Sequence, residues 1–189
     1  MESVKEASTA LAGSGQYLTF FVAGEEYAVN ILKVKEIVQY ETVTTVPNTA
    51  PWIRGVINLR GNVVPVIDLA VKFGLTRSQA TKFSCIVITE VSFQGEGITL
   101  GIMADSVNQV VDFTAKDIET PPPFGTRVRI EYLLGMGAMG KKFCLILDID
   151  KVLSAEELVA ASDSTRPAVN VSTPATPKKQ SRSAGAWFR

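Results

Sequence analysis

Hydrophobic residues along the chain fall into short runs that are rich in β-branched side chains and separated by turn-forming residues. Eight such runs lie at residues 17–22, 42–46, 55–60, 63–67, 83–91, 97–103, 108–113 and 143–149. Many short strands at close spacing are typical of sandwiches and barrels. The pattern therefore predicts a mainly β fold with a few short helices inserted.

Two segments have helical rather than strand-like spacing. Residues 30–38 begin with Asn30, a polar residue that can cap a helix. Their apolar positions fall on one stripe: Ile31, Val34, Ile37 and Val38. Ser154 begins a capping box that is completed by Glu157, so a second helix is expected there. These segments predict helices on either side of the strand-rich region.

Two turns are also expected from local sequence. A turn or short helix follows Asp68, at residues 69–74. The pair Gly61-Asn62 stands between alternating apolar runs and predicts a two-residue hairpin loop with glycine at positive φ.

The two halves of the strand-rich region resemble each other. Residues 27–38 align with residues 100–111, and small or apolar residues match at most positions. Gly55 precedes Asp68 by 13 residues, and Gly135 precedes Asp148 by the same 13. The chain is therefore expected to hold two copies of one β unit, at roughly 17–83 and 84–160, with a chance match of apolar patterns as the alternative.

Both flanks lack this pattern. Residues 1–16 are small and polar, and residues 161–189 are rich in Ser, Thr, Pro and basic side chains, so both are expected to be disordered. From residue 163 onward there are five basic residues and one acidic residue, whereas the preceding residues hold 14 basic and 18 acidic ones. The mildly acidic body disfavours nucleic-acid binding.

The residue types argue against catalysis and metal binding. The chain has no histidine, which is the commonest general base and the commonest zinc ligand. Cys85 and Cys144 stand in apolar runs without metal-ligand spacing, so we interpret them as buried hydrophobic residues. The sequence shows no signal peptide and no membrane-spanning run, so a cytoplasmic location without cofactor or metal is expected.

One pair of carboxylates, Asp148 and Asp150, allows an alternative with chemistry. A turn or capping role is favoured for Asp148, because it ends a strand and Asp68 occupies the equivalent place in the first half. A small hydrolase that uses Asp148 and Asp150 remains the alternative from another functional class.

Several motifs, taken in order, resemble those of the CheW family of chemotaxis coupling proteins. They are ILKVKEI at 31–37, RGVINLRG at 54–61, VPVIDL at 64–69, EYLLG at 131–135 and LILDIDKVL at 145–153. The resemblance covers residues 17–160. It implies two interleaved SH3-like five-stranded β-barrel subdomains and a non-enzymatic adaptor.

In that family the adaptor couples the cytoplasmic tip of chemoreceptors to the histidine kinase CheA, in signalling arrays beneath the inner membrane. A coupling protein of a non-flagellar system, serving pili or second-messenger output, is the alternative within the same class. The resemblance implies a receptor-facing set of residues: Ile31, Val34, Glu36, Gly55 and Asn58. It also implies a kinase-facing set: Ile37, Tyr40, Val43, Glu25 and Phe124.

Some details of these two sets follow from the resemblance. Gly55 is expected to leave room for the close approach of a receptor helix. A place in the barrel core is the alternative for Ile31 and Val34. At Glu119 this chain departs from relatives that can carry an arginine, which leaves open the ionic part of a second kinase contact, whereas Phe124 keeps its apolar part.

Arg60 stands at the tip of an apolar hairpin and needs a partner, because a guanidinium among apolar strands is costly unless it is paired. We expect a salt bridge between Arg60 and Glu36, which would tie the hairpin to the helix predicted at residues 30–38.

Overall fold

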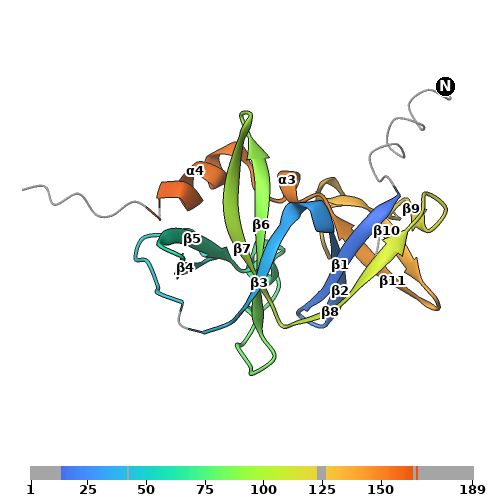
Figure 1. Ribbon diagram of the computed structural model, residues 1–189, viewed down its shortest axis with the longest axis horizontal. Helices are drawn as coiled ribbons and strands as arrows, with labels where there is room; N and C mark the ends of the chain where they lie inside the picture. The colour runs from blue at the N-terminus through green and yellow to red at the C-terminus, as the bar shows by residue number, and fades with distance from the viewer. Residues whose placement is uncertain (1–13, 42, 123–126, 164, 166–189) are drawn as a thin grey trace, which may run out of the picture.

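The computed structural model describes residues 14–41, 43–122, 127–163 and 165. Within these residues the strands form a six-stranded sheet and a five-stranded sheet (Figure 1). The strands are β1 (Gly15–Val22), β2 (Glu25–Asn30), β3 (Val34–Gln39), β4 (Ile53–Leu59), β5 (Asn62–Ile67), β6 (Cys85–Phe93), β7 (Glu96–Ala104), β8 (Ser106–Phe113), β9 (Ile118–Glu119), β10 (Leu133–Met139) and β11 (Lys142–Leu147). The helices are short: η1 (Ile31–Lys33), α2 (Leu69–Lys72), η2 (Ile130–Tyr132), α3 (Ile149–Val152) and α4 (Ala155–Asp163).

Each sheet takes strands from both halves of the chain. The first sheet has the order β8-β1-β2-β11-β10-β9, and the second has the order β3-β6-β7-β5-β4. In each half a hairpin, β1–β2 or β6–β7, is followed by a strand that crosses into the other sheet, β3 or β8. The prediction of a mainly β fold is confirmed, and the two sequence halves are repeats whose strands interleave.

The repeat extends to the register of the strands. The β4–β5 and β10–β11 hairpins both have an irregularity just before a glycine, Gly55 in one and Gly135 in the other. Both hairpins then pair in parallel with the opposite half, as β5 with β7 and β11 with β2. Arg54 and Asp68 therefore correspond to Leu134 and Asp148.

The prediction of a helix at residues 30–38 is wrong except for its first turn, which forms η1. Asn30 caps that turn, since its Oδ1 accepts a hydrogen bond from the Leu32 amide at 2.9 Å. Residues Val34–Gln39 then form β3, which pairs antiparallel with β6. The stripe consists mainly of β-branched residues, which favour strands, and exposed and partly buried positions alternate along β3 as in a half-buried strand.

Other local predictions have mixed outcomes. The capping box is confirmed: the Ser154 amide donates to Glu157 Oε2 at 2.8 Å, and the Glu157 amide donates to Ser154 Oγ at 3.3 Å. The short helix after Asp68 is α2. The strand predicted at 42–46 is wrong, because Thr44 forms only an isolated bridge with Val56.

The β4–β5 loop lies one residue earlier than predicted. Leu59 pairs with Asn62, so the two-residue turn is Arg60-Gly61, with φ of 52° and 88°. Both residues have the left-handed conformation that a tight hairpin of this twist requires.

The largest buried cluster is shared by the two sheets. It includes Phe20 and Tyr27 from the first sheet and Val87 and Ile102 from the second. Each sheet also has a smaller cluster of its own: Tyr17, Ala28, Phe113, Cys144 and Ile146 for the first, and Val64, Val66, Ile86, Ile88 and Met103 for the second. The second of these is called the second-sheet cluster below.

Both cysteines are buried, as predicted. Burial raises the pKa of the Cys85 thiol, and burial together with the nearby Glu26 carboxylate raises the pKa of Cys144 to about 11. Both side chains are therefore protonated, apolar components of the packing at neutral pH.

Candidate functional site

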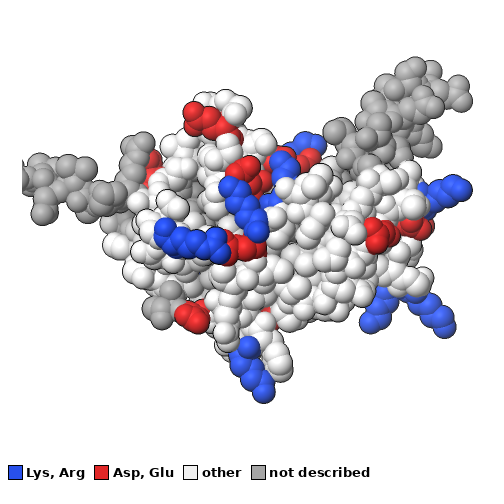
Figure 2. All heavy atoms as spheres, in the orientation of Figure 1, with Lys and Arg blue, Asp and Glu red and all other residues white. Residues whose placement is uncertain are grey.

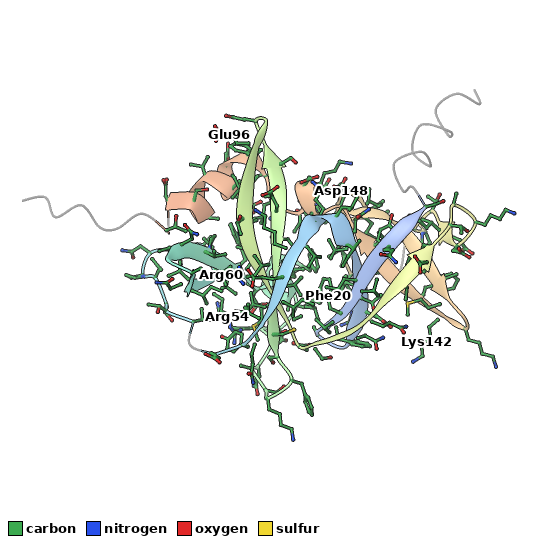
Figure 3. All side chains as sticks on the ribbon, viewed as in Figure 1. Phe20, Arg54, Arg60, Glu96, Lys142 and Asp148 are labelled. Carbon is green, nitrogen blue, oxygen red and sulfur yellow. The ribbon has the colours of Figure 1, made fainter. Side chains whose placement is uncertain are left out.

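Half of the predicted contact residues lie in β3 and β4, the two edge strands of the second sheet. The sheet curves so that these edges approach each other, and residues from both line a groove of about 430 Å³: Val38, Gln39, Glu41, Thr44, Ile57, Asn58, Leu59 and Ile86. Figure 3 shows Arg54 and Arg60 on this side of the molecule, away from Phe20 and Lys142 in the first sheet. We call this surface the β3–β4 face.

The expected ion pair between Arg60 and Glu36 forms across this face. Arg60 Nη1 lies 3.0 Å from Glu36 Oε1, and Arg60 Nη2 lies 2.8 Å from Glu36 Oε2. The pair joins the β4–β5 turn to β3, a strand rather than the expected helix. The Arg60 side chain is 77% exposed, so the guanidinium is not buried among apolar strands.

The ion pair forms part of the wall of a second groove, of about 390 Å³. The groove is lined by Lys35, Glu36, Leu59, Arg60, Asn62, Val63, Val64, Pro65, Ile88, Ile98, Thr99, Ser162 and Thr165. Figure 2 shows basic and acidic side chains side by side on this face rather than a patch of one sign. Lys35 pairs with Glu90 there, close to the pair formed by Glu36 and Arg60. We call this cavity the ion-pair groove.

Ile31 and Val34 of the receptor-facing set are partly buried and pack against the shared core. Leu32, which follows Ile31 in η1, does face solvent, and its exposed fraction is 89%. Sequence reasoning missed Leu32 because it treated the segment as a helix with one apolar stripe. An apolar residue outside that stripe was the available signal.

The expectation for Gly55 is wrong, because the space beside it is filled by the chain itself. A Cβ on Gly55 would lie 2.3 Å from the carbonyl oxygen of Thr44. Thr44 and Val56 also exchange two backbone hydrogen bonds, at 2.9 and 2.8 Å. Gly55 therefore permits close approach of the segment at 43–44 rather than of a partner.

Asn58 is exposed, and its side chain supports the hairpin tip. Asn58 Oδ1 accepts a hydrogen bond from the Gly61 amide at 2.8 Å. This bond stabilises the turn that presents Arg60.

The kinase-facing set is divided between the two sheets. Ile37 on β3 is 45% exposed, whereas Tyr40 and Val43 are partly buried against the second-sheet cluster. Glu25 is in β2 of the first sheet, where its carboxylate accepts a hydrogen bond from the Tyr27 hydroxyl at 3.3 Å. Glu119 is exposed in β9, and Phe124 lies outside the described residues.

Glu25 lines a separate groove of about 460 Å³ in the first sheet. The other lining residues are Phe21, Gly24, Glu26, Lys141, Lys142, Phe143 and Leu145. The residues predicted for the two kinase contacts therefore lie on two separate surfaces.

The most buried arginine of the β3–β4 face was missed by sequence reasoning. Arg54 is 13% exposed, and its Nη1 donates to Asp68 Oδ2 at 2.9 Å and to the Ser78 carbonyl at 2.7 Å. Its Nε donates to the Tyr40 hydroxyl at 3.0 Å, and the guanidinium lies over the Tyr40 ring, 5.6 Å from the centroid. Burial alone would lower the pKa of Arg54, but the hydrogen bonds and charges of Tyr40 and Asp68 outweigh it and raise the pKa.

Comparison of the two halves was the signal that could have identified Arg54. The second half keeps the aspartate, as Asp148, but has Leu134 where the first half has Arg54. An arginine that occurs in one copy only, while the aspartate is common to both, is the difference that marks Arg54.

Asp148 and Asp150 do not converge on one site. Asp148 begins α3, but within the described residues its carboxylate caps no backbone amide and instead pairs with Lys151 at 2.8 Å. Asp150 pairs with Lys33 at 2.7 Å and accepts a hydrogen bond from the Ser92 amide at 2.8 Å. Each carboxylate is engaged by a different lysine, so nothing in this geometry favours the hydrolase alternative.

Two surveys of the described part of the chain bear on other functions. No group of three or more His, Cys, Asp or Glu side chains there is arranged to hold a metal ion. None of the helices in the same ranges is long and apolar enough to cross a bilayer.

Comparison with known proteins identifies the family. The family model of the CheW-like domain matches residues 16–157. The chain is 41% identical to "Chemotaxis protein CheW" of Klebsiella aerogenes over 143 residues, which cover 76% of this chain and 84% of that protein. It is also 33% identical to "Chemotaxis protein CheW" of Bacillus subtilis, over 76% of this chain and 90% of that one.

A solved structure agrees with the sequence relatives. The crystal structure of the scaffolding protein TtCheW from Thermoanaerobacter tengcongensis matches with a TM-score of 0.67 and 30% identity, over 76% of this chain and 90% of that chain. The fold is thus the SH3-like fold expected from the motifs. The chain belongs to the CheW family and is a non-enzymatic chemotaxis adaptor.

Proposed function

We propose that this adaptor works in the cytoplasm, where it couples the tip of a chemoreceptor to the histidine kinase CheA in a membrane-associated array. The observation that supports the proposal is that β3 and β4, the two edge strands of the second sheet, carry residues of both predicted contact sets. A single rigid sheet can hold two partners in a fixed relation to each other, as coupling requires.

The receptor is proposed to bind at the ion-pair groove. Leu59, Val63 and Ile98 offer apolar surface there, and Glu36 and Arg60 add a charged pair beside it. A groove of mixed apolar and charged lining suits an amphipathic helix, which lays its apolar side chains into the groove and its polar ones at the edge. In this proposal Ile31 and Val34 act by supporting β3 from the core side.

The kinase is proposed to bind at the solvent face of β3 and the segment that follows it. Ile37 is a large apolar side chain, 45% exposed, on a strand with a free edge. Exposed apolar side chains of this kind supply the contact area that one barrel domain needs to dock on another. The groove that contains Glu25 is proposed as the second kinase contact.

Co-sedimentation with receptor-containing membranes tests the coupling itself. Purified CheA is mixed with these membranes in the presence and in the absence of the full chain. CheA is expected in the pellet only when both the membranes and the chain are present. Recovery of CheA in the pellet that does not depend on the chain would contradict the proposal.

The kinase contact is tested by Ile37→Asp with Val110→Asp as a matched control. Val110 on β8 is the repeat equivalent of Ile37, lies on an edge strand of the first sheet and is 48% exposed. Ile37→Asp is expected to weaken CheA binding at least about tenfold, since a hot-spot truncation costs more than about 1.4 kcal/mol. Val110→Asp is expected to leave binding unchanged, and equal losses in the two variants would contradict the assigned surface.

Val34 is a poorer probe of the receptor contact than its position in the motif implies. It packs against the shared core, so Val34→Asp is expected to destabilise the fold and weaken both interactions. Glu36→Arg combined with Arg60→Glu is sharper, because the swap keeps an ion pair across the groove and reverses the charges offered to the receptor. Loss of receptor binding in the swapped variant, with CheA binding retained, is the expected result, and unchanged receptor binding would contradict the groove assignment.

A further inference from the structure

Arg54 connects four parts of the second sheet that are separate in the sequence. It lies on β4, and its guanidinium reaches Tyr40 after β3, Asp68 at the start of α2 and the carbonyl of Ser78 in the loop before β6. The Asp68 carboxylate is 1% exposed, and its other oxygen accepts a hydrogen bond from the Val71 amide at 3.3 Å. The Asp68 carboxylate, which is itself fixed at the start of α2, therefore anchors the Arg54 guanidinium.

The Tyr40 hydroxyl receives its hydrogen bond from Arg54 Nε, on the opposite side of the guanidinium from the Asp68 and Ser78 contacts to Nη1. The ring also lies against the guanidinium plane, 5.6 Å from ring centroid to Cζ. A planar guanidinium fixes the directions of its donors, so anchoring one nitrogen also fixes the nitrogen that faces Tyr40. Lysine has a single donor centre and cannot hold both sides at once.

The same region of β4 positions the residues beyond Tyr40. Val56 exchanges two backbone hydrogen bonds with Thr44, and Gly55 lies directly beneath the Thr44 carbonyl. The Tyr40 amide donates to the Ser84 carbonyl at 3.1 Å, which continues the pairing of β3 with β6. Tyr40 and Val43 thus derive their backbone positions from β4 and β6. The Tyr40 side chain packs on the second-sheet cluster, and its hydroxyl accepts a hydrogen bond from Arg54 Nε.

We propose that Arg54 is a positioning residue for kinase docking, which orients Tyr40 through the Nε–hydroxyl bond and leaves the receptor groove unaffected. This inference rests on the proposed function, because it takes Tyr40 as part of the kinase-facing surface. Arg54 touches no partner itself. Its absence from the second copy of the repeat, where Leu134 stands, restricts this device to the sheet that bears the kinase-facing segment.

Tyr40→Phe is the cleanest test, since it removes the hydroxyl and keeps the ring, while the buried pair of Arg54 and Asp68 stays intact. CheA affinity of the full chain is expected to fall about fivefold, the effect of one side-chain hydrogen bond, and binding to receptor-containing membranes is expected to be unchanged. Arg54→Lys is expected to lower CheA affinity by a similar or larger factor. In the double variant the loss of affinity is expected to be smaller than the product of the two single effects, because both act through one bond.

A matched control exists at η2, just before β10. The Tyr132 hydroxyl accepts a hydrogen bond from Arg129 Nη1 at 3.4 Å, and the Arg129 guanidinium lies 5.5 Å from the Tyr132 ring centroid. Tyr132→Phe is expected to leave CheA affinity unchanged, since this Arg–Tyr pair belongs to η2 and not to β3 or the segment that follows it.

Three results would overturn the inference. They are an unchanged CheA affinity in Tyr40→Phe, equal losses of CheA and receptor binding, and full additivity of Tyr40→Phe with Arg54→Lys. Failure of the unsubstituted chain to bind CheA would instead overturn the proposed function. The two failures are therefore distinguishable in one set of titrations.

Discussion

The turn from β5 into α2 and the turn from β11 into α3 have the same backbone plan and different chemistry. Each has an aspartate, Asp68 or Asp148, at the N-cap position of a four-residue helix. Asp68 is 1% exposed and pairs with the largely buried Arg54, whereas Asp148 is 15% exposed and pairs with Lys151 on the next helical turn. One arginine, present in a single copy of the repeat, converts a local surface ion pair into the centre of a buried network.

This comparison separates the parts of the repeat that form the scaffold from the parts that are specific to one copy. Features that occur in both copies, such as the glycine at residue 55 or 135 and the aspartate at the strand end, maintain the strand register and the turn. Two features that occur in one copy only, Arg54 and the pair of Arg60 with Glu36, lie on the β3–β4 face. The asymmetry coincides with the face that we propose for partner binding.

The largest expected difference between the two turns is in stability. Asp68→Ala leaves the Arg54 guanidinium buried without its counter-charge, so the free energy of unfolding is expected to fall by about 3 to 5 kcal/mol. Asp148→Ala removes a pair with a lysine that is 59% exposed, and a loss below about 1 kcal/mol is expected. Urea unfolding followed by circular dichroism measures both, and similar losses in the two variants would contradict the comparison.

A smaller difference in stability is expected at acid pH, and it involves the ion pair that α2 makes with α4. Lys72 in α2 pairs with Glu157 of α4 and lies 5.7 Å from the centroids of the Trp52 and Tyr132 rings, whereas its repeat equivalent in α3 is the buried Val152. Burial alone would raise the pKa of Glu157, but Lys72 and Ser154 outweigh it and lower the pKa below its ordinary 4.5.

The folded chain therefore binds the Glu157 proton more weakly than the unfolded chain does. The stabilising contribution is complete above the ordinary pKa and is lost as pH falls through the lowered one. Glu157→Gln is expected to reduce this pH dependence, measured by urea unfolding at a series of pH values, and Glu156→Gln in the same turn should leave it unchanged; equal effects would contradict the assignment.

The smallest difference is expected between the two hairpin tips. Arg60 is in the β4–β5 turn, and Lys141 is in the matching β10–β11 turn, where Met139 pairs with Lys142. Arg60→Ala is expected to cost about 0.5 kcal/mol, because the ion pair with Glu36 is exposed to solvent and the bond from the Gly61 amide to Asn58 remains. Lys141→Ala is the control, and a loss above about 2 kcal/mol for Arg60→Ala in thermal or urea unfolding would mean that the pair supports the fold itself.

The strand-rich class, the repeat and the capping box at Ser154 were predictable because they depend on local patterns. The alternation of apolar residues and the position of turn residues act over a few positions, whatever the rest of the chain does. The segment at 30–38 was misread for a related reason. Its apolar spacing fits a helix, but Val34, Ile37 and Val38 are β-branched, and pairing with β6 decided the outcome.

The candidate site was less predictable, because exposure depends on which strands become neighbours. The pair of Arg60 with Glu36 was predicted from the need of a charge for a partner, yet the arginine that is mostly buried is Arg54. Gly55 was assigned to a partner's approach and instead accommodates Thr44. Interleaving was equally hidden from the residues alone, since two similar halves carry matching edges and can pair within a half or between halves.

Interleaving has a consequence for how the chain acquires its structure during synthesis. Tyr27 pairs with Leu145, so the β1–β2 hairpin must wait for nearly the whole folded region to be made before its second neighbour exists. Contacts between such distant residues make folding slow, and the exposed edges of unfinished sheets are prone to wrong pairing. Cutting the chain in the segment between α2 and β6 would give two fragments, each with strands of both sheets. Neither fragment holds a complete sheet, so we expect the two to fold only in association with each other.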